Sequence, residues 1–223
     1  MTTVTTGRTL DSTGEPVPGT GFELETDGHL AALLRERVGP LTSHPTRPSW
    51  AARLVDDDER IRLVSVFGPG YSGPPEHYHA TSQESFDVRQ GRIEFRLDGE
   101  RRRVAAGERV DVPTDVRHTF RCLGSELGVV VTDIEPPGRI GHVLPTLGGL
   151  AHDETADAES PLQQAVIADR LSRDTVFTER DPRVTRPLAK LLAPVGLARG
   201  YRAAHDRYRR PAFWRHHVEQ PSL

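Results

Sequence analysis

Four side chains in the middle of the chain have the types and the spacing of a metal site. His77 and His79 are two residues apart, Glu84 follows soon after them, and His118 comes in a second patterned stretch. Residues two apart on a β-strand point to the same face, so both imidazoles of the pair can enter one interior. Three imidazoles and one carboxylate are a typical ligand set for a divalent transition metal. We therefore predict that His77, His79, Glu84 and His118 bind a metal ion.

Chance is the alternative explanation for the histidine pair, because the chain contains ten histidines. A His-x-His pair alone is weak evidence for a metal site. The joint pattern is stronger evidence, since it lies in a strand-rich region and places four ligand-type residues at positions that are expected to face inward.

The ligand set suits Fe(II), Mn(II), Ni(II), Co(II), Cu(II) or Zn(II), and the sequence does not choose among them. Fe(II) is favoured, because a histidine-rich set with one carboxylate leaves room for substrate and oxygen side by side. Four protein ligands on an octahedral ion leave two positions open. Glu84 is also the candidate catalytic residue, since a carboxylate that leaves the metal can act as a base on a bound substrate hydroxyl.

Short strands are the elements that must position these ligands. Apolar and polar residues alternate over 92–97, and Asp98-Gly99 is a strong hairpin signal directly after that segment. Turn signals recur at roughly 8–12 residue spacing, which is typical of an antiparallel barrel or sandwich. The predicted strands cover 50–55, 61–67, a segment from about 77, 92–97, 101–104, 109–112, 117–122 and 127–134.

The spacing of the four ligands resembles the two sequence motifs of the cupin superfamily. The first motif is commonly G-x5-H-x-H-x(3,4)-E-x6-G. The chain matches it at His77, His79, Glu84 and Gly91, and has Tyr71 in place of the first glycine.

The second cupin motif is commonly G-x5-P-x-G-x2-H-x3-N. The chain matches it at Gly107, Pro113 and His118, whereas Asp115 replaces its second glycine and Cys122 its asparagine. Neither replacement removes a ligand, and aspartate tolerates the left-handed turn conformation better than most residues do. The resemblance covers about residues 47–135.

The resemblance implies an all-β core, a cupin jelly-roll β-barrel of the RmlC-like kind, and a homodimer. The chain is similar to the quercetin-dioxygenase-like cupins. This resemblance implies an oxygen-dependent oxidoreductase that acts on a small oxygenated aromatic or enol substrate. Two alternatives stay open, because one barrel fold serves many reactions. In the first, the metal acts without oxygen in an isomerase, cyclase or lyase of secondary metabolism. In the second, the barrel is a non-catalytic small-molecule binder.

The barrel is expected to have extensions at both ends. Residues 1–46 are predicted to form an irregular arm, which is a candidate for exchange between subunits, and a short helix over about 30–38. Residues 47–135 form the barrel. Residues 136–223 are predicted to be a loop to about 160, then helices from 161 to 173 and from 187 onward, packed on the barrel.

The candidate substrate pocket is apolar. Its predicted lining residues are Phe67, Phe86, Phe95 and Phe120, together with His142 in a loop after the last strand. Most such side chains are ordinary barrel core, but some must line a cavity if the metal is reachable. The remaining histidines, including His152, lack motif context and are expected at the surface.

Composition excludes several classes of function. The chain has 223 residues, 35% of them hydrophobic, and a formal net charge of −3, so no nucleic-acid or membrane partner is expected. Cys122 is the single cysteine, which excludes an intramolecular disulfide. We find neither a signal-peptide pattern nor an apolar run long enough for a membrane span, and expect a cytoplasmic protein.

Overall fold

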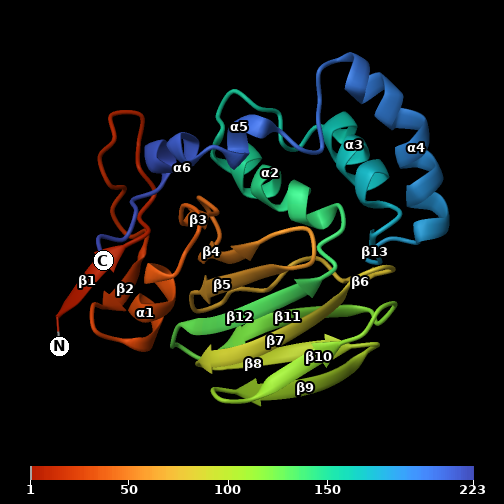
Figure 1. Cartoon of the computed structure of the whole chain (residues 1–223). Coiled ribbons are helices and arrows are strands. Elements are labelled where there is room, and N and C mark those ends of the chain that lie inside the picture. The colour runs from red at the N-terminus through yellow and green to blue at the C-terminus, as the bar shows by residue number, and fades with distance from the viewer. Residues whose placement is uncertain (1) are drawn as a thin grey trace.

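The computed structural model describes residues 2–223 and is built around two large antiparallel sheets, with the C-terminal helices along one side (Figure 1). One sheet has the strand order β10-β7-β12-β5-β4-β3, and the other has the order β13-β6-β11-β8-β9. The strands of the first sheet are β3 (Thr42–Ser43), β4 (Ser49–Asp56), β5 (Ile61–Phe67), β7 (Gln83–Gln90), β10 (Arg109–Val112) and β12 (Gly128–Glu135). Those of the second are β6 (His77–His79), β8 (Arg92–Leu97), β9 (Glu100–Ala105), β11 (His118–Leu123) and β13 (Thr175–Phe177). The all-β jelly-roll core with a helical extension is thereby confirmed.

The barrel interior is filled by apolar side chains from both sheets. Phe86 and Val110 come from one sheet, Phe95 and Ile93 from the other, and none of the four is more than 4% exposed. Strand residues alternate between two faces, so residues two apart, such as Ile93 and Phe95 of β8, enter this core together. Burying one large apolar side chain contributes about 1.5–3 kcal/mol, which makes this cluster a main source of barrel stability.

The N-terminal arm differs from its prediction as an irregular segment. It contains a small sheet of β1 (Thr3–Thr6) and β2 (Phe22–Glu25), which pair antiparallel. Phe22 packs against Trp50 of β4 with ring centroids 5.1 Å apart, and the Trp50 indole donates a hydrogen bond of 2.7 Å to the Gly7 carbonyl. Each strand is too short to give a periodic signal, so only this tertiary packing orders the arm.

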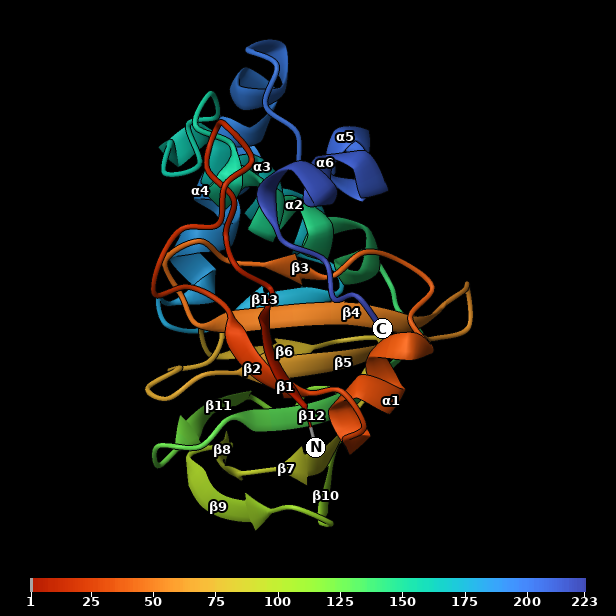
Figure 2. The same cartoon turned by 90° about the vertical axis from the view of Figure 1, so that its left-hand side faces the viewer.

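The short helix predicted after the arm is confirmed as α1 (His29–Arg35), and its N-cap is Gly28. Its buried residues Leu30 and Leu34 face the arm and β4. Figure 2 places α1 beside β1 and β2, on the side of the molecule where both chain ends lie.

The segment 138–160, predicted as a loop, contains the helix α2 (Ile140–His152). Pro145, Gly148 and Gly149 weaken the helical signal in this stretch of sequence. The two glycines are needed for packing: a Cβ on Gly149 would lie 2.3 Å from Cγ of Tyr208, so α2 can approach the C-terminal segment only without a side chain there. Tertiary contact therefore overrides local propensity.

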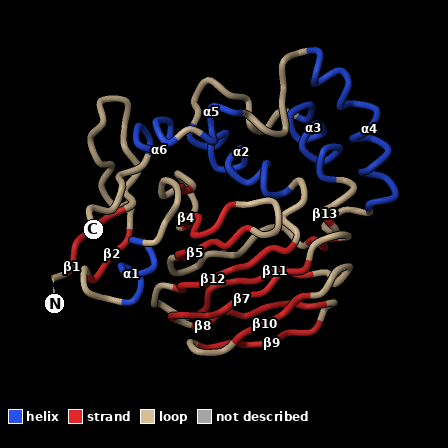
Figure 3. Tube along the Cα trace, in the orientation of Figure 1, coloured by secondary structure: helices blue, strands red, loops and turns tan. Residues whose placement is uncertain are grey.

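The remaining helices are α3 (Pro161–Leu171), α4 (Pro182–Ala198), α5 (Asp206–Arg209) and α6 (Pro211–His217). The helix from 161 is confirmed, and the helical segment around 187–197 is also confirmed, although α4 begins earlier and continues through Pro194. Figure 3 shows the helices gathered on one side of the red strands. Over the described residues, none of the helices combines the length and the apolar character needed to cross a bilayer.

His152 lies in the interior, contrary to the expectation of a surface position. It is 6% exposed, lies 3.0 Å from the Ser43 hydroxyl through Nε2, and meets the edge of the Trp214 ring. The neighbouring Asp153 forms an ion pair with Arg207 and accepts a hydrogen bond of 2.9 Å from the Tyr208 hydroxyl. The helix α5 is thus joined to the C-terminal end of α2.

Candidate metal centre

The four predicted metal ligands converge. His77 and His79 lie on β6, Glu84 on β7 and His118 on β11, so both sheets contribute. All four residues are buried, and one ligand atom from each lies within 4.8 Å of the corresponding atom of every other. His77 is directly opposite His118 in the pairing of β6 with β11, which explains how residues far apart in the sequence meet.

The outer nitrogen of each imidazole has a partner that fixes its orientation. His77 Nδ1 lies 2.7 Å from the Pro75 carbonyl, and His118 Nδ1 lies 3.0 Å from the Val116 carbonyl. A carbonyl only accepts, so both Nδ1 atoms donate and, in the neutral ring, Nε2 carries the free lone pair. His79 Nδ1 is 2.9 Å from the Thr175 hydroxyl. Outer partners of this kind orient histidine ligands in metal sites.

The inner imidazole nitrogens and the Glu84 carboxylate are arranged so that a cation between them would be stabilised. His79 Nε2 is buried and has no hydrogen-bond partner in the described part of the chain. Glu84 Oε2 lies 2.8 Å from His118 Nε2, and Glu84 Oε1 lies 3.4 Å from His79 Nε2. A lone pair facing a carboxylate oxygen is repulsive unless a proton or a metal ion lies between them. The donor set therefore fits a divalent metal ion.

The electrostatics of the cluster favour an ionised carboxylate. Burial by itself would raise the pKa of Glu84, but the contacts of its carboxylate with the His118 and His79 imidazoles outweigh it and hold that pKa well below its usual range. Burial also lowers the pKa of His77 to about 4, helped by the neighbouring His118. For His118, burial would lower the pKa, but the hydrogen bond and the charge of Glu84 raise it. Glu84 is thus the anionic member of the set.

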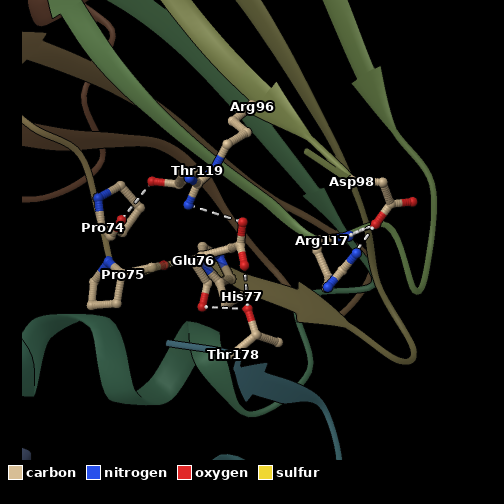
Figure 4. Close-up of polar contacts among 9 residues, drawn as sticks. All are labelled: Pro74, Pro75, Glu76, His77, Arg96, Asp98, Arg117, Thr119 and Thr178. Carbon is tan, nitrogen blue, oxygen red and sulfur yellow. Dashed lines mark hydrogen bonds and ion pairs between the residues drawn. The ribbon is translucent and has the colours of Figure 1, made fainter. Parts of the chain in front are cut away.

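The segment before His77 is held by polar contacts on three sides (Figure 4). Thr119 donates a hydrogen bond of 2.7 Å to the Pro74 carbonyl, and Glu76 forms an ion pair of 3.0 Å with Arg96. Thr178, which follows β13, donates to the Glu76 carboxylate at 2.8 Å. These contacts anchor the chain on either side of Pro75, whose carbonyl holds the His77 ring.

Two backbone positions near the site require special conformations. Asp115 has φ 64°, in the left-handed region, and its N–H donates to the His79 carbonyl at 2.8 Å. Its ability to replace the motif glycine, expected from the sequence, is confirmed. At Gly73 a Cβ would lie 1.7 Å from the Phe120 carbonyl, so the loop before β6 passes the barrel wall only as glycine.

The cluster borders a cavity of about 510 Å³. Of the five predicted pocket residues, Phe67, Phe86 and Phe120 line it. Phe95 does not: it is fully buried in the barrel core, behind Phe86 and Phe120 at centroid distances of 5.1 and 5.6 Å. His142 does not line it either, because it lies on the exposed face of α2.

Several lining residues lie outside the predicted set. Tyr71 stacks on Phe67 with centroids 4.5 Å apart, and His44 and Arg47 come from the loop between β3 and β4. Phe177 of β13 and apolar residues of α2 and α3 form another wall. Among these lining residues, only Tyr71 stood out in the sequence, because it occupies the position of the motif glycine. The loop and the helices reach the cavity only through tertiary packing.

Comparison with known proteins finds one similar curated sequence and several similar solved structures. A polyketide synthase CurC of Streptomyces cyaneus is 28% identical over 168 residues, which is 74% of this chain and 90% of that protein. The solved structure of KdgF from Halomonas sp. is 24% identical, covering 40% of this chain and 79% of that one, with a TM-score of 0.38. An RmlC-like cupin from Shewanella frigidimarina is 23% identical, covering 44% and 85%, with a TM-score of 0.39.

The family comparison concerns the part of the chain that carries the ligands. Residues 63–135 match the cupin domain family, and this range includes β6, β7 and β11. The chain therefore contains a cupin domain, and this domain carries all four candidate ligands.

Proposed function

We propose that this protein is a metal-dependent cupin enzyme, and that it is an oxygen-dependent oxidoreductase acting on an oxygenated aromatic or enol substrate. One observation carries the proposal: three oriented imidazoles and an ionised carboxylate border a cavity with mainly apolar walls. A bound divalent metal would supply Lewis acidity and, if it is Fe(II), one-electron redox chemistry. Fe(II) remains the favoured metal.

The chain's own residues would bind and orient the substrate. Phe67, Phe86 and Phe120 offer flat apolar surfaces, which suit a planar ring and exclude water from it. Glu84 stays ionised at neutral pH, so its carboxylate can accept a hydrogen bond from a substrate hydroxyl that reaches the cluster. The cavity volume of about 510 Å³ suits a molecule of two to four fused rings or smaller.

The relative supports a polyketide-derived substrate. It is called a polyketide synthase, and the match extends over most of both chains. Polyketides carry alternating carbonyl groups that enolise and close into phenolic rings, which is the chemistry of an enol or aromatic substrate. We therefore propose a step in the modification of such a compound.

A second candidate uses the metal without oxygen, as an isomerase, cyclase or lyase. The name of the relative favours it, because ring closure of a polyketone needs enolisation and no oxidant. Both candidates share the metal centre and differ in oxygen consumption, so one experiment separates them.

The decisive experiment measures metal content by elemental analysis, in the wild type and in His118→Ala, followed by oxygen uptake with catechols, flavonols and β-diketones. The matched control is His142→Ala, which removes the same side chain from an exposed position outside the cavity. We expect about one metal ion per chain in the wild type and the control, and loss of it in His118→Ala. Conversion without oxygen uptake would select the second candidate. No metal after reconstitution with Fe(II), Mn(II), Ni(II) and Zn(II) would leave a non-catalytic binding barrel.

A further inference from the structure

We propose that Arg47 selects the substrate of this cavity by pairing with a carboxylate, so that the molecule bound is an aromatic acid. The inference rests on the proposed function in one respect, because it concerns the same cavity. It adds that the substrate carries a negative charge and that Arg47 recognises this charge.

Arg47 is the only lysine or arginine among the described residues that line the cavity. Its side chain is exposed, and no ion pair or side-chain hydrogen bond of its guanidinium occurs within residues 2–223. Many other arginines of this protein are paired, such as Arg96 with Glu76 and Arg62 with Asp133. A cation without a partner at the edge of an apolar cavity is therefore available to a ligand.

The loop that carries Arg47 is fixed by backbone contacts. The His44 N–H donates to the Ser49 carbonyl at 3.1 Å, and the Ser49 N–H donates to the Arg47 carbonyl at 2.7 Å. On its far side, the Pro48 carbonyl accepts a hydrogen bond of 2.7 Å from Gly68, directly after β5. Prolines at 45 and 48 restrict the chain further. A pre-ordered loop loses less conformational entropy when a ligand binds.

The charge of Arg47 affects the pKa values of two neighbouring lining residues, Tyr71 and His44. Burial is the main cause that raises the pKa of Tyr71, and the Arg47 charge opposes it. Burial likewise lowers the pKa of His44, and the Arg47 charge adds to that effect. Tyr71 in turn stacks on Phe67, so the positive charge lies near one end of the aromatic wall.

The described lining of the cavity therefore contains two charged regions of opposite kind. One is the metal cluster, where Glu84 is the only acidic group among the described lining residues. The other is the guanidinium, whose planar fork binds a carboxylate through two parallel hydrogen bonds. A flat acid with a hydroxyl at one end and a carboxylate at the other satisfies both regions at once.

The test uses two probes of equal shape, 6-hydroxy-2-naphthoate and the neutral 6-hydroxy-2-naphthamide, with binding measured by calorimetry at low salt. In the wild type we expect the acid to bind about tenfold more tightly than the amide, since a partly exposed charged hydrogen bond is at the weak end of its range. Arg47→Gln should reduce this preference to less than twofold, and Arg47→Lys should retain part of it. Arg199→Gln, which removes a charge outside the cavity, should change nothing.

Each outcome decides the inference. Equal binding of acid and amide by the wild type would overturn it, and so would a preference that survives in Arg47→Gln. A preference that disappears after chelator treatment of the wild type would mean that the metal holds the carboxylate, which also overturns it. A protein that binds no metal but keeps the Arg47-dependent preference would refute the proposed function alone. Metal-dependent turnover without that preference would refute only the role of Arg47.

Discussion

The barrel and the helical extension bury their apolar residues in different ways. In the barrel, two sheets face each other, so Phe95 and Ile93 are covered on all sides. In the extension, α4 packs one face on α3 and leaves an apolar stripe on the other. The stripe consists of Val184, Leu188, Leu191 and Val195, which are 44 to 72% exposed. The barrel is thus the rigid frame for the ligands, whereas the extension adds walls and a strand to it.

The largest effect should come from the barrel core. Phe95→Ala removes a fully buried ring that contacts Phe86 and Phe120, so it should lower the free energy of unfolding by about 3–5 kcal/mol. Chemical denaturation monitored by circular dichroism measures this loss. If the variant is too unstable to purify, Phe95→Leu should fold and lose less. A loss below about 1 kcal/mol in Phe95→Ala would mean that the core is not the rigid frame described above.

The next largest effect should be on metal affinity, through Thr175, a residue of the helical extension that contacts the metal centre. Thr175→Val keeps the shape of a 2% exposed side chain on β13 but removes the hydroxyl that holds His79 Nδ1. Loss of such an outer partner typically weakens metal binding about 10–100-fold. Competition with a chromophoric chelator measures the affinity. Thr185→Val, on α4 of the same extension, is the control. Equal metal affinities in the two variants would show that the Thr175 hydroxyl does not support the metal centre.

His152 should make the stability of the extension depend on pH. Burial, together with the charge of the nearby His217, lowers the pKa of His152 to about 4 in the folded protein, whereas an unfolded chain has the ordinary value near 6.5. Between these values the unfolded state binds more protons, so stability is full above about pH 6.5 and falls as the pH drops toward 4.

We expect this group to contribute about 1–2 kcal/mol of the loss. Urea unfolding of the wild type and His152→Gln at pH 5 and pH 7 measures it, since glutamine cannot titrate. Parallel pH dependence in the two proteins would contradict the assignment to His152.

The smallest effect should come from the exposed stripe. Leu191→Lys replaces a side chain that is 72% exposed, so the free energy of unfolding should change by less than about 0.5 kcal/mol. A larger loss would show that the stripe is covered in solution. The homodimer expected from the sequence stays a prediction, and sedimentation of the wild type and this variant over a range of concentrations tests it.

The sequence predicted the centre better than it predicted the surroundings of the centre. His77, His79, Glu84 and His118 are found together because strand alternation and turn spacing are local signals. The cavity wall is different: Arg47 and Phe177 reach it from a loop and from a three-residue strand. Such residues have no periodic pattern of their own, so only the folded chain reveals them.

The helix α2 and the buried His152 were missed for a related reason. Proline and glycine in 140–152 argue against a helix when propensity is considered alone. The close packing of Gly149 on Tyr208, about 60 positions later in the chain, reverses that preference. His142 and Phe95 were wrongly placed in the pocket because a residue's type and face do not tell which depth of the barrel it occupies.

The pairing of β13 with β6 has a consequence for the order of events during synthesis. Thr175 lies opposite His79 in this pairing, and the two residues are 96 positions apart. A nascent chain that has emerged only as far as β12 already contains all four ligands, but the His79 ring still lacks its outer partner and β6 is an open edge. Long-range closures of this kind are slow to form. The metal centre is therefore completed late, only after the chain has been made and has emerged through β13.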